Sequence, residues 1–135
     1  MANEQFSQNV SGRPNGLTCK VDYAGHTIPL RLTNLYGVHQ LYAITAAIAT
    51  GIAVGMPLLT ITQALESYEP PIGRGKLLEG IKNTWILDDS YNASPAAMTA
   101  ALETLKNFPS PGRKIAVLGD MLELGSYTID AHREA

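Results

Sequence analysis

The chain has 135 residues, a hydrophobic content of 45% and a formal net charge of −2 at pH 7. This length suits one domain or two small pieces of domains, and the slightly acidic balance gives no electrostatic case for binding nucleic acid. The single cysteine, Cys19, excludes a disulfide framework and a cysteine metal cluster, which is compatible with a cytoplasmic protein. Residues 1–16 are polar, lack the apolar core of a secretory signal and predict a loose lead-in.

The first regular element that we expect is a β-hairpin. Residues 17–23 alternate between apolar and polar side chains, Ala24-Gly25 forms a turn, and residues 26–32 return as a second strand. Pro29 has no N–H to give to a strand partner. The second strand is therefore expected to be an edge strand or to end its pairing early.

The longest apolar segment runs from about residue 38 to residue 54, and no charged residue occurs between Arg31 and Glu66. Such a run raises the question of a membrane span. Glycines interrupt it and no basic flank marks its ends, so a packed core helix is the better interpretation and no membrane span is expected. Pro57 then begins a second helix, whose apolar face comprises Leu58, Ile61, Leu65 and Tyr68.

A boundary is expected near residue 70, where the run EPPIGRGK places two prolines and two glycines within eight residues. This division gives two parts, 1–70 and 71–135. Arg74 and Lys76 lie in the glycine-rich stretch that follows the boundary. They form either a solvated hinge or a phosphate contact, because a guanidinium offers planar paired donors to phosphate.

A strand–helix–strand pattern follows the boundary. Residues 76–79 and 84–87 predict two short strands around a turn, and the second strand leads into the polar run DDSYN. Ser94 and Pro95 predict a capped helix start. The apolar face of this helix comprises Met98, Ala101, Leu102 and Leu105.

Residues 114–118, with the sequence KIAVL, predict a further strand that ends at Gly119-Asp120. The second part is therefore predicted to contain a βαβ unit, and the fold class is α/β. Ligands collect at the carboxyl ends of strands in such units. The polar residues expected at these ends are Asp88, Asp89, Asn92 and Asp120. On spacing alone, turn residues and a helix cap are the favoured interpretation of these positions, ahead of a ligand site.

Two stretches carry a resemblance to a known family. The run DDSYNASPAAMTAALETL, followed by RKIAVLGDMLELG and His132, resembles the start of the C-terminal domain of the Mur ligases. Within that family it is similar to the branch that adds D-alanyl-D-alanine to UDP-N-acetylmuramoyl-tripeptide in peptidoglycan synthesis. Residues 37–47 resemble the end of the central domain. The resemblance implies that the chain is an internal fragment: residues 1–70 would end the central ATP-binding domain, and residues 71–135 would begin the Rossmann-like C-terminal domain.

The resemblance also implies a set of nucleotide-binding residues. The family arginine that matches Arg74 reaches the nucleotide, and the aspartate that matches Asp89 contacts the ribose. Asp88, Asn92 and His39 complete the implied set. The family pattern has asparagines where this chain has Gln40 and Ala43. An alanine methyl group cannot make the hydrogen bonds by which the second asparagine recognises adenine.

The family reaction requires more than this chain contains. ATP, with Mg²⁺, phosphorylates the carboxylate of the UDP-N-acetylmuramoyl-peptide, and the amine of D-alanyl-D-alanine then attacks. The sequence has no G-x-x-x-x-G-K-[ST] motif and no stretch resembling the family's metal-holding residues. We therefore expect no catalytic or metal-binding residue here, and no ligase activity from the chain alone. Two alternatives stay open: a non-catalytic nucleotide- or partner-binding module derived from such a ligase, and an unrelated small α/β domain.

Overall fold

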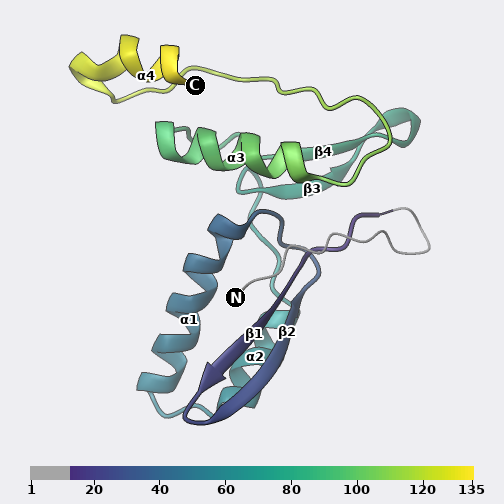
Figure 1. The fold of residues 1–135 in the computed structure, drawn as a ribbon, viewed down its shortest axis with the longest axis vertical. Helices are drawn as coiled ribbons and strands as arrows, with labels where there is room; N and C mark the ends of the chain where they lie inside the picture. The colour runs from purple at the N-terminus through teal and green to yellow at the C-terminus, as the bar shows by residue number, and fades with distance from the viewer. Residues whose placement is uncertain (1–12) are drawn as a thin grey trace. The chain divides into compact units, whose positions relative to one another are not determined.

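The computed structural model describes residues 13–135 and has two compact units, which divide between Pro70 and Pro71 (Figure 1). Each unit combines helices with a small sheet, so the predicted mixed α/β class is confirmed. The predicted loose lead-in lies outside the described residues as far as residue 12.

The predicted N-terminal hairpin is present. β1 (Leu17–Tyr23) pairs antiparallel with β2 (His26–Leu32) over their whole length, from Leu17 opposite Leu32 to Tyr23 opposite His26. Both turn residues have positive φ, 49° at Ala24 and 80° at Gly25, as the right-handed twist of a tight hairpin requires. The sheet has two strands, so β2 is an edge strand, as Pro29 predicts.

Two helices follow the hairpin, as expected. A 3₁₀ turn, η1 (Val38–Gln40), leads into α1 (Leu41–Ala53), and α2 (Leu58–Glu66) begins directly after Pro57. Over residues 13–135, no helix has both the length and the apolar character that crossing a membrane requires.

The core of the first unit lies between one face of the hairpin and the two helices. Its buried side chains are Leu17, Leu30, Leu32, Leu35, Ile44, Ile48 and Ile61. Gly51 allows the helices to approach, because a Cβ there would lie 2.7 Å from Cδ1 of Ile61. Leu58 and Leu65 pack against this core as predicted. Tyr68 does not belong to the apolar face, because α2 has already ended and its side chain is 39% exposed.

Residues 13–16 are packed into the first unit, so the predicted loose lead-in is wrong for them. Pro14 and Gly16 are buried, and the hydroxyl of the buried Tyr36 donates a hydrogen bond to the Pro14 carbonyl oxygen at 3.1 Å. A Cβ at Gly16 would lie 1.9 Å from the Leu32 carbonyl oxygen. This close approach explains why glycine is required there.

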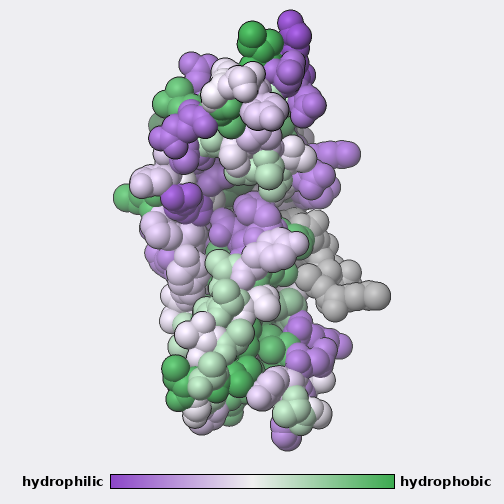
Figure 2. All heavy atoms as spheres, turned by 90° about the vertical axis from the view of Figure 1, so that its left-hand side faces the viewer, coloured by the Kyte–Doolittle hydropathy of each residue, from purple (hydrophilic) through white to green (hydrophobic). Residues whose placement is uncertain are grey.

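The outer face of α1 is unusually apolar for a surface. Figure 2 shows the lower part of the molecule on this side as mainly green and white. Small side chains such as Ala43, Ala46 and Ala47 are exposed along the helix, and Tyr42 is 82% exposed.

The second unit begins with another hairpin. β3 (Lys76–Glu79) pairs antiparallel with β4 (Trp85–Asp88), and η2 (Ile81–Asn83) forms the turn. α3 (Pro95–Asn107) then begins at the predicted cap, where the Ala97 N–H donates to Ser94 Oγ at 3.3 Å. Residues Met98, Ala101, Leu102 and Leu105 are half-buried, in agreement with the predicted face.

The strand predicted at residues 114–118 is not formed. The segment is extended, but it pairs with no strand within residues 13–135, and Val117 is 92% exposed. An extended segment becomes a strand only where a neighbouring strand satisfies its N–H and C=O groups, and β4 pairs only with β3. The predicted βαβ unit is therefore not closed. The chain continues through η3 (Gly125–Tyr127) to α4 (Thr128–Glu134).

Candidate functional site

The carboxylate of Asp88, at the end of β4, organises the loops around it. Its Oδ2 accepts a hydrogen bond from the Gly73 N–H at 3.1 Å. Its Oδ1 accepts from the Ser90 hydroxyl at 2.6 Å and from the Ser90 N–H at 3.2 Å. The hydrogen bond from the Ser90 hydroxyl is the main reason that the pKa of Asp88 lies below its usual value of 3.8. The backbone N–H groups of Ser90 and Gly73 lower this pKa further, by smaller amounts. Asp88 is therefore a structural carboxylate that fixes two loops.

Backbone hydrogen bonds join the same two loops. The Gly75 N–H donates to the Asp88 carbonyl oxygen at 2.9 Å, and the Tyr91 N–H donates to the Gly73 carbonyl oxygen at 3.1 Å. Gly73 has a φ of 75°, and a Cβ there would lie 3.0 Å from the Tyr91 nitrogen. We call residues 73–75 and 88–91, joined in this way, the glycine clip. The positive φ and this close approach both favour glycine at this position.

Arg74 projects from the glycine clip onto an aromatic ring. Its Cζ lies 4.0 Å from the centroid of the Tyr91 ring, a cation–π contact. Both side chains are exposed, and 70% of Tyr91 is accessible to solvent. The guanidinium thus lies beside the polar run that follows β4.

Asp89 and Asn92 accept fewer hydrogen bonds than Asp88 does. The Asp89 carboxylate is half-buried and has no hydrogen bond or ion pair with any residue from 13 to 135. Asn92 Oδ1 accepts from the neighbouring Ala93 N–H at 2.9 Å. Around the clip, the second unit thus gathers a guanidinium, an available carboxylate and an amide. Such groups can bind phosphate and ribose hydroxyls.

His39 lies in the first unit, on η1. Its side chain is half-buried and makes no hydrogen bond within the described part of the chain. Ala43 follows on the exposed side of α1. The nucleotide roles expected of His39, Arg74, Asp88, Asp89 and Asn92 stay predictions.

The structure also shows a groove that our sequence analysis missed. Its volume is about 500 Å³, and it lies between β1 and α1. Val21, Ile44 and Ile52 are among the apolar side chains that line it, and none of the predicted site residues does. The only sequence signal was the small residues of α1, such as Ala49, which leave space beside the strand.

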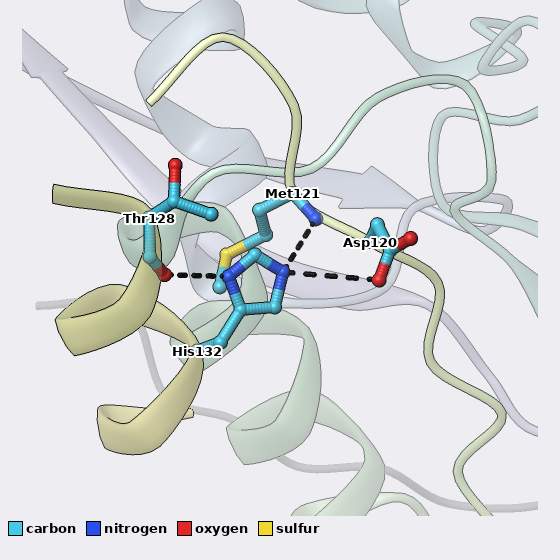
Figure 3. Close-up of polar contacts among 4 residues, drawn as sticks. All are labelled: Asp120, Met121, Thr128 and His132. Atoms are coloured by element: carbon cyan, nitrogen blue, oxygen red, sulfur yellow. Dashed lines mark hydrogen bonds and ion pairs between the residues drawn. The ribbon is translucent and has the colours of Figure 1, made fainter. Parts of the chain in front are cut away.

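A second missed feature is the contact of His132 with the segment around Asp120 (Figure 3). The Met121 N–H donates to His132 Nε2 at 3.0 Å, and His132 Nδ1 lies 2.7 Å from the Thr128 carbonyl oxygen. This pattern fits a neutral imidazole that carries its proton on Nδ1. Asp120 Oδ1 lies 4.0 Å from Nε2. The strand whose carboxyl end was expected to bring Asp120 to Asp88 and Asp89 is not formed, so the grouping of the three carboxylates stays a prediction.

Potential metal ligands are scattered over the two units. Within residues 13–135, no three or more His, Cys, Asp or Glu side chains gather as a metal site would require.

Comparisons with known proteins agree with the resemblance in the sequence. The family described as Mur ligase, glutamate ligase domain, matches residues 73–135. UDP-N-acetylmuramoyl-tripeptide--D-alanyl-D-alanine ligase of Escherichia coli is 37% identical over 101 residues, which cover 75% of this chain and 22% of that protein. The protein of the same name from Buchnera aphidicola is 31% identical over 128 residues, which cover 95% of this chain and 27% of that protein.

Solved structures give the same result. MurF ligase from Thermotoga maritima, in complex with ADP, matches with a TM-score of 0.81 and 27% identity, over 98% of this chain and 29% of that one. MurF from Acinetobacter baumannii matches with a TM-score of 0.80 and 29% identity, over 89% of this chain and 26% of that one.

These findings identify the chain as part of a member of the Mur ligase family. Its relatives and structural neighbours are, in particular, ligases of the MurF type. The chain spans only about a quarter of the length of the relatives that it matches.

Proposed function

We propose that this chain forms the junction segment of a ligase that adds D-alanyl-D-alanine to UDP-N-acetylmuramoyl-tripeptide. Residues 1–70 would end the central ATP-binding domain, and residues 71–135 would begin the C-terminal domain. Its task would be to contact the nucleotide, with Arg74 at a phosphate and Asp89 at the ribose. Asp88 and Asn92 would shape that site. His39, in the first unit, keeps the nucleotide role that the resemblance implies for it.

The observation that carries this proposal is the glycine clip. Asp88 holds the loop of Arg74 against the loop of Asp89, leaving the Asp89 carboxylate without a partner within residues 13–135. The clip thus joins a loop that carries a guanidinium to a loop that carries an uncommitted carboxylate, two groups that suit the phosphate and the ribose of a nucleotide. The ADP complex of the Thermotoga maritima MurF supports a nucleotide as the ligand.

The same proposal states that the chain alone does not ligate, because it contains no phosphate-cradling loop. Phosphoryl transfer depends on groups that position and neutralise the phosphates together. Purified chain, incubated with MgATP, UDP-N-acetylmuramoyl-tripeptide and D-alanyl-D-alanine, should form no product above a blank. Turnover by this material would contradict the proposal.

A chimera tests the positive half of the proposal. Residues 16–135 replace the matching segment of the Escherichia coli ligase, and D-alanyl-D-alanine addition is measured. Arg74→Gln should raise the KM for ATP by roughly tenfold to a hundredfold, since a hydrogen bond to a charged group contributes about 1.5–3 kcal/mol. Arg113→Gln, at another exposed arginine of the second unit, is the matched control and should leave the KM unchanged. An equal KM for both variants would remove Arg74 from the site.

A second candidate is a non-catalytic nucleotide- or partner-binding module derived from such a ligase. The replacement of a family asparagine by Ala43 favours it, because that change removes an adenine contact from the implied site. In an active chimera, Ala43→Asn should increase the affinity for ATP about threefold to tenfold, as one added neutral hydrogen bond predicts, and should leave the affinity for GTP unchanged. A chimera that folds, binds ADP and never ligates would favour the module.

A further inference from the structure

We propose that Tyr91 positions the Arg74 guanidinium for a nucleotide phosphate, an inference that rests on the function proposed above. The guanidinium carbon lies 4.0 Å from the centre of the Tyr91 ring. The backbone of the same tyrosine donates to the Gly73 carbonyl oxygen at 3.1 Å. Tyr91 therefore holds both the side chain of Arg74 and the residue that precedes it.

The packing of the second unit does not explain the tyrosine. Its ring is 70% exposed, so it adds little to a hydrophobic core. Its hydroxyl makes no hydrogen bond to a residue between 13 and 135. What remains is the ring face, and that face is where Arg74 lies. The aromatic ring itself, more than the phenol, is the part with a role.

The contact suits a positioning role for physical reasons. An arginine side chain is long and flexible, and fixing it when a phosphate binds costs conformational entropy. A ring that already holds the guanidinium reduces this cost. The attraction is to the face of the ring and uses no oxygen acceptor. Tyr91 therefore does not compete with a phosphate for the N–H groups of Arg74.

The glycine clip fixes where this pair stands. Gly73 is held by the Asp88 carboxylate, and a Cβ at Gly73 would lie only 3.0 Å from the Tyr91 nitrogen. The ring and the arginine thus rise from two backbone segments that cannot separate without breaking several hydrogen bonds. Tyr91 also follows Asp89, the carboxylate proposed to bind the ribose, by two residues in the same loop.

The test is an ADP titration of the 135-residue chain followed by NMR spectroscopy. Tyr91→Leu should lower the affinity for ADP about twofold to fivefold, the factor that corresponds to the free energy of an exposed cation–π contact. Tyr91→Phe keeps the ring and should bind as the wild type does. Tyr127→Leu removes another exposed tyrosine of the same unit and is the matched control. The Arg74 Nε–H resonance should show an aromatic ring shift in the wild type and lose it in Tyr91→Leu.

A double-mutant cycle separates positioning from a general effect on the fold. With Arg74→Gln present, Tyr91→Leu should weaken ADP no further. If it weakens ADP equally in both backgrounds, or if Tyr91→Phe is as weak as Tyr91→Leu, the positioning role is wrong and the proposed nucleotide site stands. If the wild type does not bind ADP, or Arg74→Gln binds it equally well, the nucleotide role fails and the positioning role fails with it.

Discussion

Replacing Gly73 by alanine tests the tightest point of the glycine clip. The φ of 75° costs an L-residue about 1–2 kcal/mol. The new Cβ would also lie 3.0 Å from the Tyr91 nitrogen, which is too close for an ordinary contact. Relief requires Tyr91 to shift by a few tenths of an ångström, which strains its hydrogen bond to the Gly73 carbonyl oxygen and costs up to about 1 kcal/mol more. We therefore expect a total loss of up to about 3 kcal/mol in the free energy of unfolding of the second unit.

Gly125→Ala is the matched control in the same unit. Gly125 also has a positive φ, 58°, but a Cβ there would meet nothing within 4 Å. Gly125→Ala should therefore lower the free energy of unfolding by only about 1–2 kcal/mol, the cost of a positive φ for an L-residue. Urea unfolding followed by Trp85 fluorescence reports on this unit, because Trp85 is the single tryptophan and lies in β4. Hydrogen exchange of the Tyr91 amide should also accelerate in Gly73→Ala alone. Equal stability losses and unchanged Tyr91 exchange would refute this close contact.

The remaining predictions concern the core, a helix cap and pH. Leu30 is fully buried, so Leu30→Ala should lower the free energy of unfolding by about 2–5 kcal/mol. Leu59 is 56% exposed, and Leu59→Ala should lower it by less than about 0.5 kcal/mol. Thermal unfolding followed by circular dichroism measures both. Ser94→Ala removes the acceptor for the Ala97 N–H and should lower the free energy of unfolding by about 1 kcal/mol, measured by Trp85 fluorescence. Ser94→Asp supplies another acceptor and should restore the lost stability. Because the folded state lowers the pKa of Asp88 below 3.8, its hydrogen bonds stabilise the fold above that pH, and this contribution disappears as the pH falls through the lowered value. The stability advantage over Asp88→Asn should therefore shrink on acidification, and a constant difference would contradict this assignment.

Elements with local signals were predictable from the sequence. The Ala24-Gly25 turn needs two residues with positive φ between alternating strands, and the hairpin formed there. Ser94 and Pro95 marked the first turn of α3, because one supplies an acceptor and the other tolerates a missing N–H. In both places the determinants lie within a few residues of each other, so no tertiary information was required.

Elements that depend on distant partners were not predictable. The run at residues 114–118 has the composition of a strand, but a strand exists only through its neighbour. Pro14 belongs to the fold because Tyr36, 22 residues away, covers its carbonyl group. The pair Asp88-Asp89 could not be resolved either, because sequence alone cannot tell which carboxylate receives hydrogen bonds. In the structure, Asp88 accepts these hydrogen bonds, whereas Asp89 has no partner among residues 13–135.

The glycine clip has a consequence for the order of folding. Its side-chain bond joins Gly73 and Asp88 across a separation of 15 residues, and the β3–β4 hairpin lies between them. Closing so short a loop costs little chain entropy, and contacts of low sequence separation form quickly. The clip should therefore be assembled together with the β3–β4 hairpin. Pulse-labelling hydrogen exchange during refolding would show the Tyr91 amide protected at the same time as the amides of β3 and β4. The loop that we propose to contact the nucleotide would then be fixed as soon as this hairpin is paired.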